Sequence, residues 1–170
     1  MILDTQTHSD LELGLTDAIL RSKAENLSIL FSYTFQFETR DLLPLLSHPA
    51  DKNSCRIYWE QPREGFALAG LGKVLEINFD ANQSLDSLNE KIGNYFKQAI
   101  HVSNHPFAGP RFLGGHFFNP QANPDDTWGE FPRACYILPE CLATLNPDGC
   151  WLTISKMVTK DDNHKSLLRE

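Results

Sequence analysis

The segment that most constrains the fold runs from Arg56 to Lys73. Its two apolar stretches, Arg56–Gln61 and Phe66–Ala69, are separated by only Pro62-Arg63-Glu64-Gly65. Proline presets the φ angle for a turn, and glycine accepts the backbone conformations that other residues avoid there. The segment therefore predicts two strands joined by a tight turn. Gly70 and Gly72 predict a bend before a further strand over residues 73–79.

A second strand is predicted by alternation between Leu27 and Glu38. Bulky side chains fall on one face of this segment, namely Ile29, Phe31, Tyr33, Phe35 and Phe37. Polar side chains fall on the other, namely Ser28, Ser32, Thr34 and Gln36, with Leu30 as the exception. A period of two is typical of a strand. Apolar runs predict further strands over residues 112–118, 134–138 and 150–158, the last after a Pro147-Asp148-Gly149 turn.

One clear amphipathic helix is predicted over residues 84–100. Its apolar side chains recur at helical spacing and form one stripe, Leu85, Leu88, Ile92, Phe96 and Ala99. Ser84 suits the N-cap position. A short helix is expected from Thr16 to about Ala24, and a helical turn from Asp41 to Ser47. Residues 1–12 are expected to form a loose leader.

These elements predict an α+β fold, with a mostly antiparallel sheet covered by the helix at 84–100. Strands and helices do not alternate regularly, which disfavours a doubly wound parallel sheet. The expected organisation is a leader and short helix over residues 1–26, a single α+β domain over 27–158, and a polar tail over 159–170.

Composition excludes some functional classes. The 170 residues hold 15 Lys+Arg and 22 Asp+Glu, a net charge of −7, which argues against a nucleic-acid surface. No apolar run approaches the length of a membrane span, and no signal peptide is apparent at the start, so a cytoplasmic location is expected. The four cysteines, Cys55, Cys135, Cys141 and Cys150, form no C-x-x-C pair and are expected to be buried thiols without zinc.

Two glycine motifs are candidate binding sites. Gly70-Leu71-Gly72-Lys73 lacks the spacing of a phosphate loop, so a strand bend is favoured. Gly114-Gly115 could let a ligand or another backbone approach closely, and His116 could titrate near neutral pH. The favoured interpretation is that the glycines permit tight sheet packing and that His116 is a satisfied polar residue.

The charged residues and histidines form no stronger candidate binding site than the glycine motifs. Trp59-Glu60 with Arg63 could hold an anionic substrate, but an exposed ion pair beside a core tryptophan is favoured. The histidines, His101, His105 and His116, are not spaced as metal ligands on one element. The paired carboxylates Asp125-Asp126 and Asp161-Asp162 are expected to be solvated. No catalytic, cofactor-binding or metal-binding residue is therefore assigned.

Several motifs in order resemble those of isochorismate synthases, which are chorismate-utilising enzymes. They are Phe31–Phe35 with Leu42–Leu46, Ile57–Glu60 with Arg63, Ala69–Gly72, Arg111–Phe118, Trp128 with Phe131, and Ile137–Pro139. The resemblance spans roughly residues 27–158. Glu140 departs from it, because a basic residue is expected after the proline.

The resemblance implies an enzyme that isomerises chorismate to isochorismate with Mg²⁺. A lysine base and glutamates would do this chemistry in a C-terminal chorismate-binding domain that follows this region. None of those motifs is found here, and Lys156 is not assigned the lysine's role because its surroundings do not match. The resemblance therefore implies the N-terminal region of such an enzyme, with its own C-terminal domain as partner. The chain alone is expected to be inactive, to bind no Mg²⁺ and to self-associate.

Two alternatives stay open from the sequence. One is the N-terminal region of another chorismate enzyme, such as the anthranilate synthase large subunit, in which this part binds an inhibitory amino acid. The other is a free-standing, non-catalytic binding module. Menaquinone or phylloquinone biosynthesis is the pathway that the resemblance favours, ahead of siderophore or salicylate production.

Overall fold

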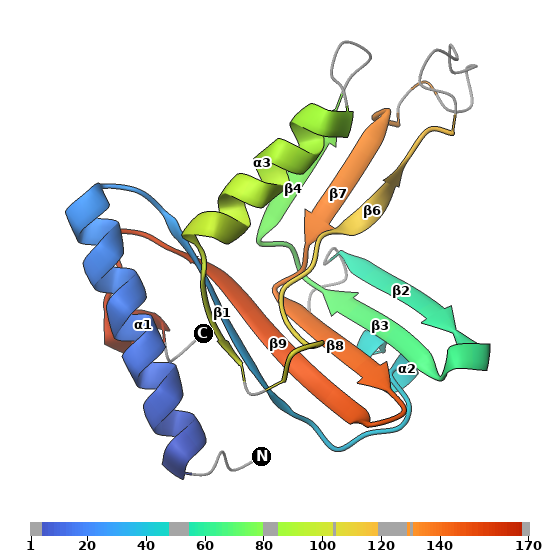
Figure 1. Ribbon diagram of the computed structural model, residues 1–170, viewed down its shortest axis with the longest axis horizontal. Helices are drawn as coiled ribbons and strands as arrows, with labels where there is room; N and C mark the ends of the chain where they lie inside the picture. The colour runs from blue at the N-terminus through green and yellow to red at the C-terminus, as the bar shows by residue number, and fades with distance from the viewer. Residues whose placement is uncertain are drawn as a thin grey trace.

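The computed structural model describes residues 5–47, 55–79, 85–103, 105–118, 129 and 131–167. They form two sheets (Figure 1). The six strands of sheet A lie in the order β2 (Arg56–Gln61), β3 (Phe66–Leu71), β8 (Cys141–Asn146), β9 (Gly149–Val158), β1 (Ile29–Gln36) and β5 (Ile100–Ser103). The three strands of sheet B lie in the order β4 (Leu75–Phe79), β7 (Ala134–Leu138) and β6 (Leu113–His116). All strand pairs are antiparallel except β1 with β5, so the predicted α+β class is confirmed.

The hairpin predicted first is present as β2 and β3. Residues Arg56 to Gln61 pair with Leu71 to Phe66, and the 3-10 turn η1 (Pro62–Glu64) joins them. Gly65 closes the turn with φ of 60°, a left-handed conformation that glycine adopts without steric cost. The predicted helical turn is also present, as α2 (Leu43–Leu46).

The N-terminal helix is longer than predicted. Helix α1 (Thr5–Glu25) includes eight of the twelve residues expected to form a loose leader, so that expectation was wrong for residues 5–12. One face of α1 buries Leu15, Ala18 and Ile19 against β1. The matching face of β1 is the predicted apolar one, and its side chains Ile29, Phe31, Tyr33 and Phe35 are all buried in the same cluster. How the chain divides into domains stays a prediction.

The opposite face of β1 is buried as well, although its side chains are polar. Ser32 and Thr34 are 0% and 2% exposed, and they lie beside Ser155 and Thr153 of β9. Helix α1 thus covers the apolar face of β1, and the β5–β6 connection lies against the other face of sheet A at His101 and Trp151. Alternation predicted the strand and its two faces correctly, but it did not reveal that Ser32 and Thr34 on the polar face are buried.

Helix α3 (Leu85–Gln98) is the predicted amphipathic helix, and it covers sheet B rather than sheet A (Figure 1). Its Leu88 is buried with Ile77, Phe79 and Ala134. The helix ends at Gln98, and the chain continues directly into β5, which the sequence had assigned partly to the helix. Strand β8 and the short helix α4 (His164–Leu167) were not predicted. The expected cap Ser84 lies outside the described residues.

Candidate functional site

Hydroxyl groups and one imidazole form a polar layer on the inner face of sheet A. The Thr34 hydroxyl lies 2.9 Å from the Thr153 hydroxyl and 3.1 Å from His101 Nε2. Ser32 and Ser155 share a second contact of 3.1 Å. These bonds satisfy side chains that would be costly to bury alone. They also fix the His101 ring on edge strand β5.

The connection from β5 to β6 passes over this layer, and we call its residues 105–112 the strap. Gly109 of the strap is buried against His101, because a Cβ there would lie 2.8 Å from the ring atom Cε1. The His105 ring stacks on Trp151 of β9 with centroids 3.8 Å apart. Partial desolvation lowers the pKa of His101 from its usual 6.5, which favours the neutral imidazole.

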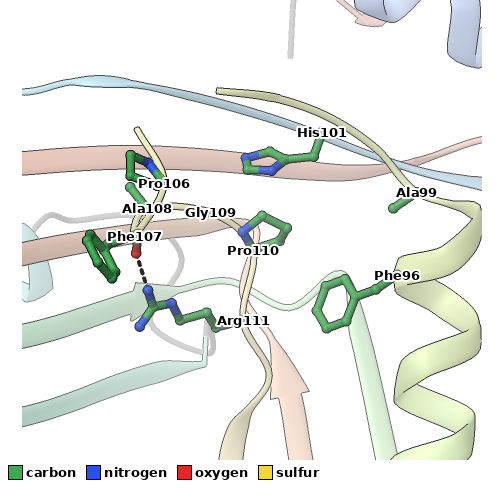
Figure 2. Close-up of a pocket in the computed structure, with 9 residues that line it drawn as sticks. All are labelled: Phe96, Ala99, His101, Pro106, Phe107, Ala108, Gly109, Pro110 and Arg111. Atoms are coloured by element: carbon green, nitrogen blue, oxygen red, sulfur yellow. Dashed lines mark hydrogen bonds between the residues drawn. The ribbon is translucent and has the colours of Figure 1, made fainter. Parts of the chain in front are cut away.

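An open cavity of about 340 Å³ lies between the strap, the end of α3 and β5. Figure 2 shows His101 on one side of it and Arg111 on another, with Phe96 at the end of α3. The guanidinium of Arg111 donates to the carbonyl oxygen of Phe107. The remaining lining comes from Ala99, Pro106, Ala108, Gly109 and Pro110. Polar and apolar atoms contribute about equally to the lining, and a cavity of this size can hold a small ligand.

The sequence singled out no residue of this cavity as a binding residue. His101 and His105 were considered only as metal ligands. The one local signal was the Pro- and Gly-rich run from His105 to Pro110, which is typical of a loop but does not reveal what the loop covers. Within the described ranges, no group of three or more His, Cys, Asp or Glu side chains is arranged to hold a metal ion.

The Gly70–Lys73 segment forms the predicted bend. Gly72 has φ of 68°, and a Cβ on Gly70 would lie 2.8 Å from Cγ of Pro139. Both glycines are therefore explained by backbone conformation and packing. Lys73 pairs with the carboxylate of Glu76, which also accepts a 2.6 Å hydrogen bond from Asn78. The Lys73 hydrogen bond is the main cause of a lowered pKa at Glu76.

The structure separates the two glycines of the Gly114-Gly115-His116 motif. A Cβ on Gly114 would lie 2.0 Å from the carbonyl oxygen of Cys135 on β7, so tight packing accounts for it. No described atom lies within 4 Å of a Cβ placed on Gly115, which has no positive φ. His116 Nδ1 is 3.0 Å from the Tyr136 hydroxyl, so it is a partnered polar residue.

The third candidate, Trp59-Glu60 with Arg63, lies at the exposed edge of sheet A. Trp59 is 45% exposed and packs edge-to-face on Phe66, so it is not the core residue that was expected. Glu60 accepts a 2.6 Å hydrogen bond from the Tyr58 hydroxyl, and this bond raises the pKa of Tyr58. Arg63 lies in η1, beyond the end of the strand. Asp161 and Asp162 begin the segment before α4, whereas Asp125 and Asp126 lie outside the described residues.

The cysteines are free thiols, and Cys150 is buried as predicted, while the other three are partly exposed. Desolvation raises the pKa of Cys150 to about 11. We expect its alkylation at about pH 8 to be roughly 100-fold slower in the folded chain than in urea, because about two pKa units remove that share of thiolate. Peptide mass spectrometry after timed iodoacetamide treatment measures both rates, and equal rates would contradict the expectation.

The raised pKa of Cys150 also makes stability depend on pH. The stability that the protonated thiol contributes is present below about pH 9 and is lost as the pH rises through about 11.

Comparison with known proteins identifies the family. A family model described as chorismate binding enzyme matches residues 16–170. The chain belongs to the chorismate-binding enzyme family. Isochorismate synthase MenF of Bacillus subtilis (strain 168) is 26% identical over 159 residues, which are 89% of this chain and 34% of MenF. The chain thus spans about a third of the length of the curated relative it matches, and the family expected from its motifs is confirmed.

No helix in the described part of the chain is both long and apolar enough to cross a membrane.

Proposed function

We propose that this chain is the N-terminal region of an isochorismate synthase whose remaining polypeptide carries the chemistry. The observation that supports this most is the alignment with MenF, which covers nearly all of this chain and only a third of that enzyme. The described residues form two sheets and one open cavity, and the sequence motifs identify no catalytic group among them. In this proposal the region supports and walls the active site, and the lysine base and glutamates lie in the other two thirds.

Magnesium is proposed to belong to that other region as well. Mg²⁺ prefers several oxygen ligands in octahedral geometry. The described carboxylates do not gather in this way, since Glu76 is occupied by Lys73 and Asn78 and Glu60 by Tyr58. The described residues therefore do not fit a magnesium site. A cytoplasmic location and a role in menaquinone or phylloquinone biosynthesis are part of the same proposal.

We expect the purified 170-residue chain to form no isochorismate from chorismate, with or without Mg²⁺. The protein encoded by the complete reading frame of the source gene is expected to form it, and to stop when Mg²⁺ is chelated by EDTA. Chromatographic separation of chorismate and isochorismate measures both. Turnover by the 170-residue chain would contradict the proposed division of labour, and an inactive complete protein would contradict the proposed function.

The cavity beneath the strap favours one second candidate, a non-catalytic binding module. An open space of about 340 Å³, with an imidazole and a guanidinium at its walls, is of the size that small ligands occupy. Calorimetric titration of the chain with chorismate and with tryptophan separates the possibilities. Binding of tryptophan would favour the anthranilate synthase alternative, and binding of chorismate by the chain alone would favour a binding module.

A further inference from the structure

Among the described residues, helix α3 covers one face of sheet B, and the other face meets sheet A at Leu113, which lies beside Gly70 of β3. Helix α3 packs on the face that carries Ile77, Phe79 and Ala134, and these side chains are 2%, 5% and 4% exposed. The other face is made by the alternate residues of the same strands. We call this the open face of sheet B, and its residues are Glu76, Asn78, Leu113, Gly115, Cys135 and Ile137.

The open face combines partly buried apolar side chains with exposed polar ones, which is unusual for a surface that faces only solvent. Leu113, Cys135 and Ile137 are only partly exposed and apolar, while Glu76 and Asn78 are exposed and bonded to each other. Strand pairing aligns Asn78, Cys135 and Gly115 in one row across the sheet. The pKa of Cys135 is raised, mainly because its thiol is partly desolvated.

Gly115 is the residue that the described chain does not explain. Its neighbour Gly114 is required by the backbone of β7, but a side chain on Gly115 would meet none of the described atoms. Glycine in a strand weakens it, through backbone entropy and the lack of a side chain to pack. A glycine kept at such a cost commonly marks a place where another backbone or a ligand approaches closely.

We infer that the open face of sheet B, centred on Gly115, is where the rest of the parent polypeptide docks. This inference rests on the proposed function, because its occupant is the part of the enzyme that the MenF alignment leaves uncovered, about two thirds of that length. The occupant brings a backbone or small side chain against Gly115, apolar groups against Leu113 and Ile137, and donors toward the Glu76 carboxylate. The pairing of Glu76 with Lys73 makes a charged partner unnecessary.

Gly115→Val tests the docking because it is expected to change the Tm differently in the 170-residue chain and in the protein from the complete reading frame. In the 170-residue chain the valine meets none of the described atoms and suits a strand, so the Tm is expected to stay the same or rise. In the protein from the complete reading frame the same side chain would push against the docked segment. We expect its Tm to fall by about 5 °C or more relative to wild type, together with a loss of activity. Scanning fluorimetry of all four proteins measures this.

Gly93→Ala is the matched control, since Gly93 lies in α3 on the other side of sheet B and a Cβ there also meets no described atom within 4 Å. It is expected to leave the complete protein folded and active. Alkylation of Cys135 adds a readout that needs no activity, and we expect it to be at least about tenfold slower in the complete protein than in the chain.

The possible results separate this inference from the proposed function. Cys135 protection and a Gly115→Val defect in a complete protein that lacks isochorismate synthase activity would support the docking and overturn the function. An active complete protein that tolerates Gly115→Val, with Cys135 as reactive as in the chain, would overturn the docking. A raised KM for chorismate with an unchanged Tm would also overturn it, because the face would then contact substrate. A reading frame that ends at Glu170 would overturn both.

Discussion

Deletion of residues 1–25 is expected to abolish the cooperative unfolding transition of the chain. Helix α1 covers one face of β1, where Ile29, Phe31, Tyr33 and Phe35 are each 6% exposed or less. Exposing a buried side chain of this size costs about 1.5–3 kcal/mol. Four of them together amount to roughly the whole stability of a typical domain, about 5–15 kcal/mol. Urea titration followed by circular dichroism and tryptophan fluorescence measures the transition.

A point variant tests the same contact in a chain that still folds. Ile19 is 7% exposed in the interface of α1 with β1, whereas its neighbour Leu20 is 61% exposed. Ile19→Ala is expected to lower the free energy of unfolding by about 3 kcal/mol, and Leu20→Ala by less than about 0.5 kcal/mol. A deletion variant that keeps a sharp transition at the wild-type midpoint, or equal losses for the two alanine variants, would show that the contact of α1 with β1 is dispensable for folding.

The contrast between α1 and β1 shows what the sequence can reveal. The alternation around Phe31 and Phe35 is local, so it predicts the strand without knowledge of its neighbours. The buried contact of helix α1 is made by Leu15, Ala18 and Ile19, with Leu11 partly buried against the same cluster. A stripe this short is overlooked among polar residues, and the contact with β1 makes the helix stable in context.

Strands β5 and β8 were missed for a different reason. Ile100 continues the apolar spacing of α3, so its assignment to the helix is reasonable until the parallel pairing with Phe31 is known. Strand β8 follows Pro139 and Glu140 directly after β7 and belongs to the other sheet. The pairing of β5 with β1 is long-range and leaves no local signal, whereas β8 forms a hairpin with β9 across the predicted turn at Pro147 and could have been found from that turn. The cavity also depends on the pairing of β5 with β1, because β5 brings His101 to Thr34, 67 residues away.

For the Gly114-Gly115 pair, the interpretation favoured from the sequence is correct for one of the two glycines. The sequence suggested two roles for it, close sheet packing and approach by another group, and favoured packing. Packing explains Gly114, since β6 and β7 lie too close there for a side chain. It does not explain Gly115. Because alternate residues of a strand point to opposite faces, two adjacent glycines can serve two different purposes.

Gly114→Ala is expected to lower the free energy of unfolding by about 3 kcal/mol or more, because overpacking against backbone cannot be relieved by a rotamer change. The new Cβ would lie 2.0 Å from the carbonyl oxygen of Cys135 and 2.7 Å from Cα of Tyr136. Strand β6 must then move away from β7, which breaks the pairing of Gly114 with Tyr136 and the hydrogen bond between His116 and the Tyr136 hydroxyl.

Two other glycines provide the controls for this prediction. Gly115→Ala adds the same methyl group one residue along the same strand and is expected to change stability by less than about 0.5 kcal/mol in the chain. Gly93→Ala in helix α3 is expected to stabilise by up to about 1 kcal/mol, the usual difference between alanine and glycine in a helix. Urea titrations with a common m-value give all three. Equal losses for Gly114→Ala and Gly115→Ala would contradict the close approach of β6 to β7, and with it the separation of the two glycines on which the docking surface depends.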